Sequence, residues 1–237
     1  MYVIRRKEIN LFIKWRKHVT ADSNMFFVED GVLDPEAYIH AALKICSFLK
    51  EVPSDDTAAS GYVFGERFLR EVEETGDDEY LQKKGSLSIL AKRIEVIRYV
   101  FEGLPIPEPI QMLKESAYVN IKKYSGKKTS NQKDLENIAQ KDRGLLKEQI
   151  DDVLNPDIIL CGNTRHYLGF IYGESNIKLV MEDAKKQIQM YHLPVDEKQS
   201  RLVIEMPHPS HRGSENELLR ELKALLENYQ DSGLCII

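Results

Sequence analysis

Four side chains in this sequence could act together on an N-glycosidic bond. Glu51 and Asp55 offer carboxylates, Asn120 offers an amide, and His208 lies between two prolines. A carboxylate can position water or stabilise an oxocarbenium-like sugar, and a histidine can hydrogen-bond the departing base. An asparagine can read a base edge with one donor and one acceptor. These residue types therefore predict the removal of a base from a nucleotide.

The polar residues lie at the ends of short apolar runs that predict buried strands. The runs cover residues 45–49, 117–121 and 201–206, and a further run over 157–162 ends in glycine. Residues 188–193 form a weaker strand candidate. We therefore expect the polar residues to be positioned by the ends of strands.

Helical spacing of apolar residues separates these strands. Helices are predicted at 5–18, from Pro35, at 61–74, at 86–101, at 131–153, and from Ser214, where Ser214 and Glu217 form a capping box. Strands that alternate with helices predict an α/β fold with three layers, α/β/α, around a central, mostly parallel sheet. In such a sheet ligands bind at the carboxyl ends of the strands, where the polar segments would converge. We expect one domain over residues 1–237, with residues 1–40 as an N-terminal helical extension.

The order of the motifs resembles the uracil-DNA glycosylase superfamily over roughly residues 42–229. The first motif of that family, G-[EQ]-x-P, corresponds to Lys50-Glu51-Val52-Pro53, and its G-x-P-F-x-G motif corresponds to Gly61-Tyr62-Val63-Phe64-Gly65. The base-reading asparagine at a strand end corresponds to Asn120. The final H-P-S motif is matched by His208-Pro209-Ser210.

This resemblance implies a uracil-DNA glycosylase-like fold and a monofunctional DNA glycosylase that flips a pyrimidine nucleotide out of the helix. The base would stack on Phe64 or Tyr62 and be read by Asn120. His208 would support the departing base while Glu51, or Asp55 through water, assists at C1′. The resemblance implies that the reaction needs no metal or organic cofactor and that its product is an abasic site.

The sequence also departs from the family pattern. Lys50 and Val63 replace a glycine and a proline, and Val52 occupies the place of the aspartate that activates water in some branches. The divergent first loop indicates a substrate other than plain uracil. By resemblance to superfamily members in bacterial antiviral defence, that substrate would be a modified pyrimidine such as glucosylated hydroxymethylcytosine in phage DNA.

The predicted partner is double-stranded DNA, such as modified phage DNA, and the expected contacts to it lie in two segments. The contacts are Lys122, Lys123, Lys127, Lys128, Ser210, His211 and Arg212. Arg212 occupies the place where the family often uses a leucine wedge. The whole chain has a formal net charge of −5, but Glu71–Glu79 concentrates acidic residues away from these segments. The charge therefore predicts modest, salt-sensitive DNA affinity.

The composition excludes several other classes of protein. The 237 residues are 42% hydrophobic and 30% charged, without an apolar run of the roughly 20 residues that span a bilayer. Three dispersed cysteines support neither a disulfide framework nor an iron–sulfur cluster, and the histidines lack metal-ligand spacing. We expect a cytoplasmic monomer without a signal peptide, metal or cofactor.

Three alternative functions use the same features. A uracil-excising repair glycosylase would share the fold and the site. A non-catalytic sensor of modified nucleotides or DNA would bind without releasing a base. A nucleoside hydrolase would hold calcium in an aspartate-rich cluster at a strand end, which this sequence lacks.

Overall fold

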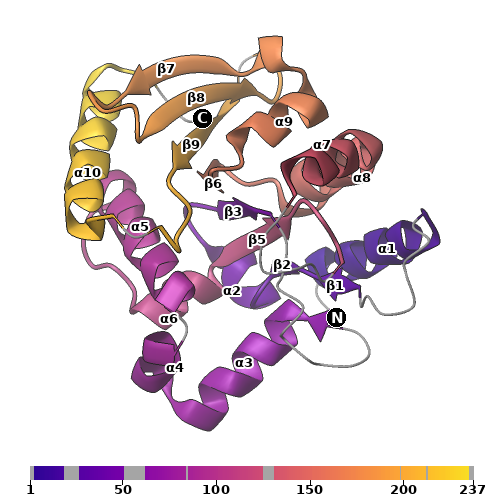
Figure 1. Ribbon diagram of the computed structural model, residues 1–237. Helices are drawn as coiled ribbons and strands as arrows, with labels where there is room; N and C mark the ends of the chain where they lie inside the picture. The colour runs from indigo at the N-terminus through magenta and orange to yellow at the C-terminus, as the bar shows by residue number, and fades with distance from the viewer. Residues whose placement is uncertain are drawn as a thin grey trace.

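A seven-stranded mixed sheet forms the centre of the protein in the computed structural model (Figure 1). The structure describes residues 3–18, 27–50, 62–83, 85–124, 131–197, 199–211 and 213–234, without the side chains of 62–64. The strands run in the order β2 (Gly31–Val32), β5 (Ser116–Asn120), β3 (Ile45–Leu49), β6 (Ile158–Gly162), β9 (Ser200–Met206), β8 (Gln189–Pro194) and β7 (Lys178–Glu182).

The four central strands β5, β3, β6 and β9 are parallel, as expected. The outer strands are antiparallel to their neighbours: β2 to β5, β8 to β9, and β7 to β8. The sheet is thus largely but not purely parallel. A separate parallel pair joins β1 (Val28–Glu29) to β4 (Tyr62–Val63).

Helices cover both faces of the sheet. One face is covered by α1 (Val3–His18), α2 (Pro35–His40), α7 (Gln132–Lys141), α8 (Arg143–Glu148), the π-helical turn η1 (Gln149–Leu154) and α9 (Arg165–Tyr172). The other is covered by α3 (Phe64–Thr75), α4 (Asp77–Lys83), α5 (Gly85–Glu102), α6 (Pro109–Lys114) and α10 (Glu215–Asp231). A short 3₁₀ turn, η2 (Glu174–Asn176), follows α9. The three-layer α/β/α arrangement predicted from the alternation of strands and helices is therefore present (Figure 1).

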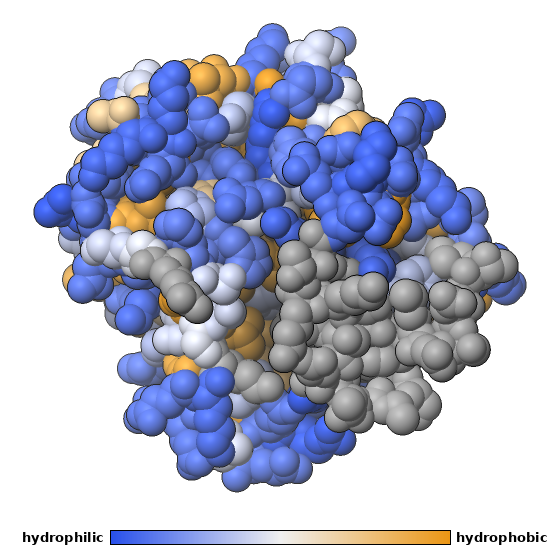
Figure 2. All heavy atoms as spheres, viewed as in Figure 1, coloured by the Kyte–Doolittle hydropathy of each residue, from blue (hydrophilic) through white to orange (hydrophobic). Residues whose placement is uncertain are grey.

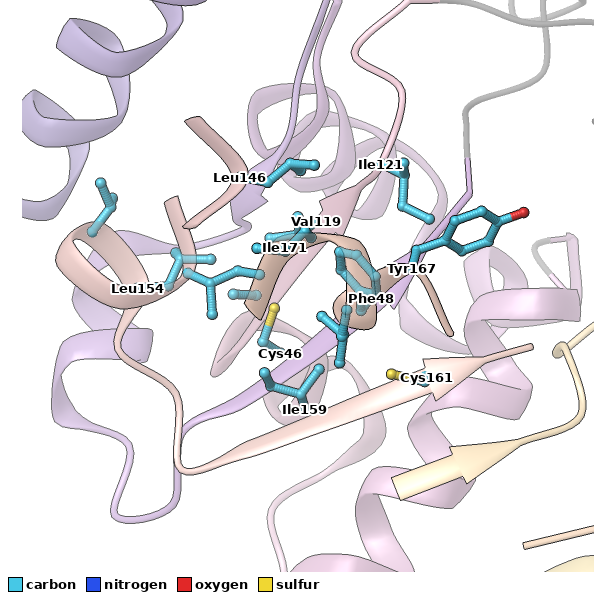
Figure 3. Packing of buried hydrophobic residues seen from close by; sticks show 14 of the residues in the cluster. Cys46, Phe48, Val119, Ile121, Leu146, Leu154, Ile159, Cys161, Tyr167 and Ile171 are labelled. Atoms are coloured by element: carbon cyan, nitrogen blue, oxygen red, sulfur yellow. The ribbon is translucent and has the colours of Figure 1, made fainter. Parts of the chain in front are cut away.

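Alternating strand residues divide the core into two layers. Cys46, Phe48, Val119, Ile159 and Cys161 pack with Leu146, Leu154, Tyr167 and Ile171 on one face (Figure 3). Ile45, Tyr118, Ile158, Leu160, Leu202 and Ile204 pack under α5 and α10 on the other. This two-residue alternation is the side-chain geometry of a strand buried on both faces.

Several predicted elements are confirmed with changed boundaries. The helix expected over 131–153 is divided into α7, α8 and η1, with Asp142 between the first two. Ser214 caps α10 through a 3.4 Å hydrogen bond from the Glu217 N–H. Leu11, Phe12 and Trp15 of α1 are buried in the first core layer, so this part of the predicted N-terminal extension packs with the domain. No helix in the described part of the chain is long and apolar enough to cross a membrane.

Candidate functional site

The carboxyl ends of β5, β3, β6 and β9 lie along one edge of the sheet. In the sequence, β3 is followed by β5 and then by β6. In the sheet, β5 lies on one side of β3 and β6 lies on the other. This reversal leaves a crevice between the ends of β3 and β6, which is the usual ligand position in open α/β sheets. The register pairs Leu49 with Asn120 and Gly162 with Met206. Three strand spacings, about 14 Å, therefore separate the β5 and β9 ends.

The turn after β9 holds His208 over the end of β6. A Cβ atom on Gly162 would lie 3.2 Å from Pro209 Cδ and 3.5 Å from His208 Cδ2, so glycine permits this close approach. Arg93 of α5 anchors the turn from the other side, because its Nη1 donates to the Pro207 carbonyl at 2.7 Å. The Arg93 guanidinium also binds the Glu215 carboxylate at 2.9 Å and 3.0 Å.

The ring of His208 has a defined hydrogen-bond polarity. The backbone N–H of Ser210 donates to His208 Nδ1 at 3.1 Å, and Ser210 Oγ lies 2.8 Å from the same atom. Because a backbone N–H can only donate, Nδ1 is an acceptor and the proton of the neutral ring is on Nε2. Burial lowers the pKa of His208, and the charges of Lys50 and Arg93 lower it further. A neutral His208 therefore offers an Nε2–H donor.

Asn120 at the end of β5 belongs to a buried polar network. Its backbone N–H and its Nδ2 both donate to Asp30 Oδ2, at 2.6 Å and 3.1 Å. Gln149 of η1 donates to Asp30 Oδ1 at 2.8 Å. Asp30 thus fixes one Asn120 donor, while the amide retains a second hydrogen and an acceptor for other partners.

Lys123 must be removed from the predicted DNA contacts. Its side chain has no exposed surface, and its ammonium binds both Asp30 oxygens at 2.6 Å and 2.7 Å. The Nζ atom also lies 4.9 Å from the centre of the Trp15 ring. Burial lowers the pKa of Lys123, whereas Asp30 raises it. This cation is a buried partner of Asp30 and is unavailable to a phosphate.

A cavity of about 320 Å³ opens at the crevice, on the side covered by α7 and α9. Glu205 of β9 is the register partner of Cys161, which packs in the core layer under these helices, so the two side chains share that face of the sheet. Polar groups dominate the lining, which consists of Lys50, Gln132, Leu135, Asn163, His166, Tyr167 and Glu205.

Glu205 is the carboxyl group of this cavity. Its Oε2 accepts the N–H groups of Thr164 and Arg165 at 3.4 Å and 3.0 Å. Burial raises its pKa to about 7, although these N–H groups and the charges of Arg165 and Lys50 act in the opposite direction. Near neutral pH, Glu205 therefore populates both a protonated and an ionised form.

Three further hollows lie elsewhere in the described part of the chain and do not combine these features. One of about 910 Å³ lies beside α1, α2 and η1, and one of about 450 Å³ lies between α4 and α6. A small one of about 100 Å³ lies between the start of α10 and the turn after β9. The surface shown in Figure 2 is mostly hydrophilic, with apolar side chains reaching it in small separate areas. We place the candidate site at the carboxyl edge because cavity, titratable groups and strand ends coincide there.

The other predicted site residues divide into two groups. Lys122, Ser210 and His211 are described and lie just beyond the ends of β5 and β9. Predictions for Glu51, Asp55, Lys127, Lys128 and Arg212 lie outside the described residues. Tyr62 and Phe64 begin β4 and α3, but their side chains are outside the description as well.

Three residues of the cavity were not predicted as site residues from the sequence: Lys50, His166 and Glu205. Glu205 had a detectable signal, since it is a charged residue in the otherwise apolar run Leu202–Met206. His166 lies in a short helix that was not predicted. Within the described ranges, no three metal-ligating side chains come together as a metal site would require.

Comparisons with known proteins add little to this description. No family model matches the sequence, and no curated protein matches it. A structural match is the crystal structure of a domain of unknown function from Bordetella bronchiseptica with bound citrate, at 12% identity and a TM-score of 0.34. The alignment covers 81% of this chain and 43% of that chain, so this chain spans less than half of that protein's length. A likeness at this level carries no argument about function.

Proposed function

We propose that this protein is a DNA glycosylase that flips out a pyrimidine base and hydrolyses its N-glycosidic bond. The base would be a modified one, such as glucosylated hydroxymethylcytosine in phage DNA, and the role would be antiviral defence. The single observation that carries the proposal is the polarity of His208 at the carboxyl edge. Its Nδ1 accepts the Ser210 N–H, and its Nε2–H has no partner among the described residues and can donate.

The chemistry follows from that donor. As the bond between C1′ and the base nitrogen breaks, its electron pair leaves with the base and negative charge develops on a base carbonyl oxygen. A hydrogen bond from His208 Nε2–H stabilises this charge where it forms. Water then adds to C1′, assisted by Glu51 or Asp55, and the product is an abasic site.

Asn120 supports the same proposal from the opposite end of the crevice. The Asp30 carboxylate holds its amide in a fixed orientation. A held amide can read the edge of a pyrimidine with its remaining donor and acceptor. The separation of about 14 Å between the β5 and β9 ends leaves room for a ring between two side chains.

Base release from defined duplexes tests the proposal. Duplexes with one uracil, hydroxymethylcytosine or glucosylated hydroxymethylcytosine would be incubated with the protein, and released bases would be identified by mass spectrometry. We expect release from the modified duplex and a loss of about a hundredfold or more in His208→Ala. His40→Ala, on α2, is the matched control and should keep full activity. Full activity in His208→Ala, or tight binding without any abasic product, would overturn the proposal.

A further inference from the structure

The Glu205 cavity lies beside the proposed base site and is not used by its chemistry. Lys50 connects the two places, because its charge acts on His208 and on Glu205. The lining of the cavity includes His166 and Tyr167 on α9 but not His208. The cavity therefore offers space for a part of the substrate other than the reacting bond.

The lining provides both donors and acceptors. The Lys50 ammonium donates, Glu205 accepts or donates according to its protonation, and Gln132 and Asn163 each offer both functions. In the part of the chain that the structure describes, Glu205 Oε2 takes both backbone N–H groups and Oε1 makes no hydrogen bond. That oxygen is available to a bound group.

The charges of the cavity restrict what it can hold. An anionic group would meet the ionised form of Glu205, and a cationic group would meet Lys50. A purely apolar group would leave several polar side chains without partners, which is unfavourable. A neutral group with several hydroxyls fits the lining, because each hydroxyl both donates and accepts.

The walls and the size agree with a single ring. The His166 and Tyr167 rings lie together with their centres 3.7 Å apart, and Leu135 adds an apolar contact. A cavity of about 320 Å³ is at the small end of the usual range for ligand pockets. We propose that this cavity is a second subsite, which binds a neutral polyhydroxylated ring attached to the target base. This subsite rests on the proposed function, and in it Glu205 would recognise the hydroxyl groups of the attached ring.

Binding measurements separate this subsite from catalysis. Fluorescence anisotropy would give Kd values for duplexes with one hydroxymethylcytosine or one glucosylated hydroxymethylcytosine, in a His208→Ala background that prevents turnover. We expect about tenfold tighter binding of the glucosylated duplex, and we expect Glu205→Ala to remove most of that preference. Glu221→Gln on α10, a half-buried carboxylate on the opposite face of the sheet, is the matched control and should retain the preference.

The possible outcomes distinguish the two proposals. Equal Kd values for both duplexes, or an unchanged preference in Glu205→Ala, would overturn the subsite. Near-ultraviolet circular dichroism of Glu205→Ala would show whether the fold is retained, and Gln132→Ala provides a second test on α7 if it is not. Wild-type protein that releases no base from any duplex would overturn both the proposed function and the subsite. Release without a glucosyl preference would overturn the subsite alone.

Discussion

At the scale of single residues, Asp30 joins a candidate site residue to a buried ion pair. Its carboxylate accepts from Asn120 and from Lys123, and both of its partners are buried with it. A buried charge without its partner is costly, whereas removal of both charges is often tolerated. The orientation of Asn120 therefore depends on a pair of charges that the proposed chemistry does not use.

Lys123→Met should be strongly destabilising. The substitution leaves Asp30 as an unpaired buried carboxylate, and we expect the free energy of unfolding to fall by about 3–5 kcal/mol. The double variant Asp30→Asn, Lys123→Met removes both charges and should recover a large part of that loss. Urea denaturation followed by circular dichroism measures both effects.

An exposed lysine provides the control for this prediction. Lys92→Met on α5 changes the same chemical group at the surface and should shift the free energy of unfolding by less than about 0.5 kcal/mol. A double variant as unstable as Lys123→Met would contradict the ion-pair argument.

The sequence predicted some site residues better than others. His208 and Asn120 could be placed at strand ends because the apolar runs before them are local signals. Burial of Lys123 could not be predicted, because its partner Asp30 is 93 residues away in the chain. The charge of Glu205 within an apolar run was a local signal, but the cavity around it depends on α7 and α9, which are distant from β9 in the sequence.

At the scale of elements, the entry of β2 into the sheet depends on one glycine. Gly31 has φ +114°, a conformation that side chains disfavour, and an added Cβ would lie 1.9 Å from Glu8 Oε1. Glu8 Oε1 also accepts the Val32 N–H at 2.9 Å, so α1 and β2 meet at this point. Glycine here allows a buried carboxyl group of α1 to reach the edge of the sheet.

Gly31→Ala should therefore destabilise the protein far more than a similar change elsewhere. Strain in the backbone and the clash with Glu8 together should lower the free energy of unfolding by about 3 kcal/mol or more. Gly144→Ala in α8 meets nothing within 4 Å and should be neutral or stabilising by up to about 1 kcal/mol. Thermal unfolding gives the melting temperatures of the two variants, and we expect that of Gly31→Ala to be clearly lower. Equal melting temperatures would argue against a special role for Gly31.

The elements differ in how well the sequence predicted them. The central strands were predictable because strands buried on both faces are continuous apolar runs. The edge strand β7 was not, since Leu179 is exposed and β7 has a neighbouring strand on one side only. The break between α7 and α8 was also missed, because the apolar side chains keep helical spacing through it although the helix is interrupted at Asp142.

At the scale of the whole molecule, two buried carboxyl groups connect stability to pH. Burial raises the pKa values of Glu8 and Glu205 to about 7 from an ordinary value of 4.5. Between these values the folded state holds protons that the unfolded state has released. Stability should therefore decrease as pH rises from about 4.5 to 7 and change little from these groups outside that window.

Glu8→Gln isolates the contribution of one of the two groups. Glutamine keeps an acceptor for the Val32 N–H but cannot ionise, so the variant should lose the part of the pH dependence that belongs to Glu8. We expect its free energy of unfolding, relative to wild type, to rise by about 1–3 kcal/mol between pH 5 and pH 8. Denaturant unfolding at both pH values gives this difference, and Glu205 continues to titrate equally in both proteins. A difference that does not change with pH would mean that Glu8 is ionised throughout, with Arg5 at 3.2 Å as the partner that keeps it so.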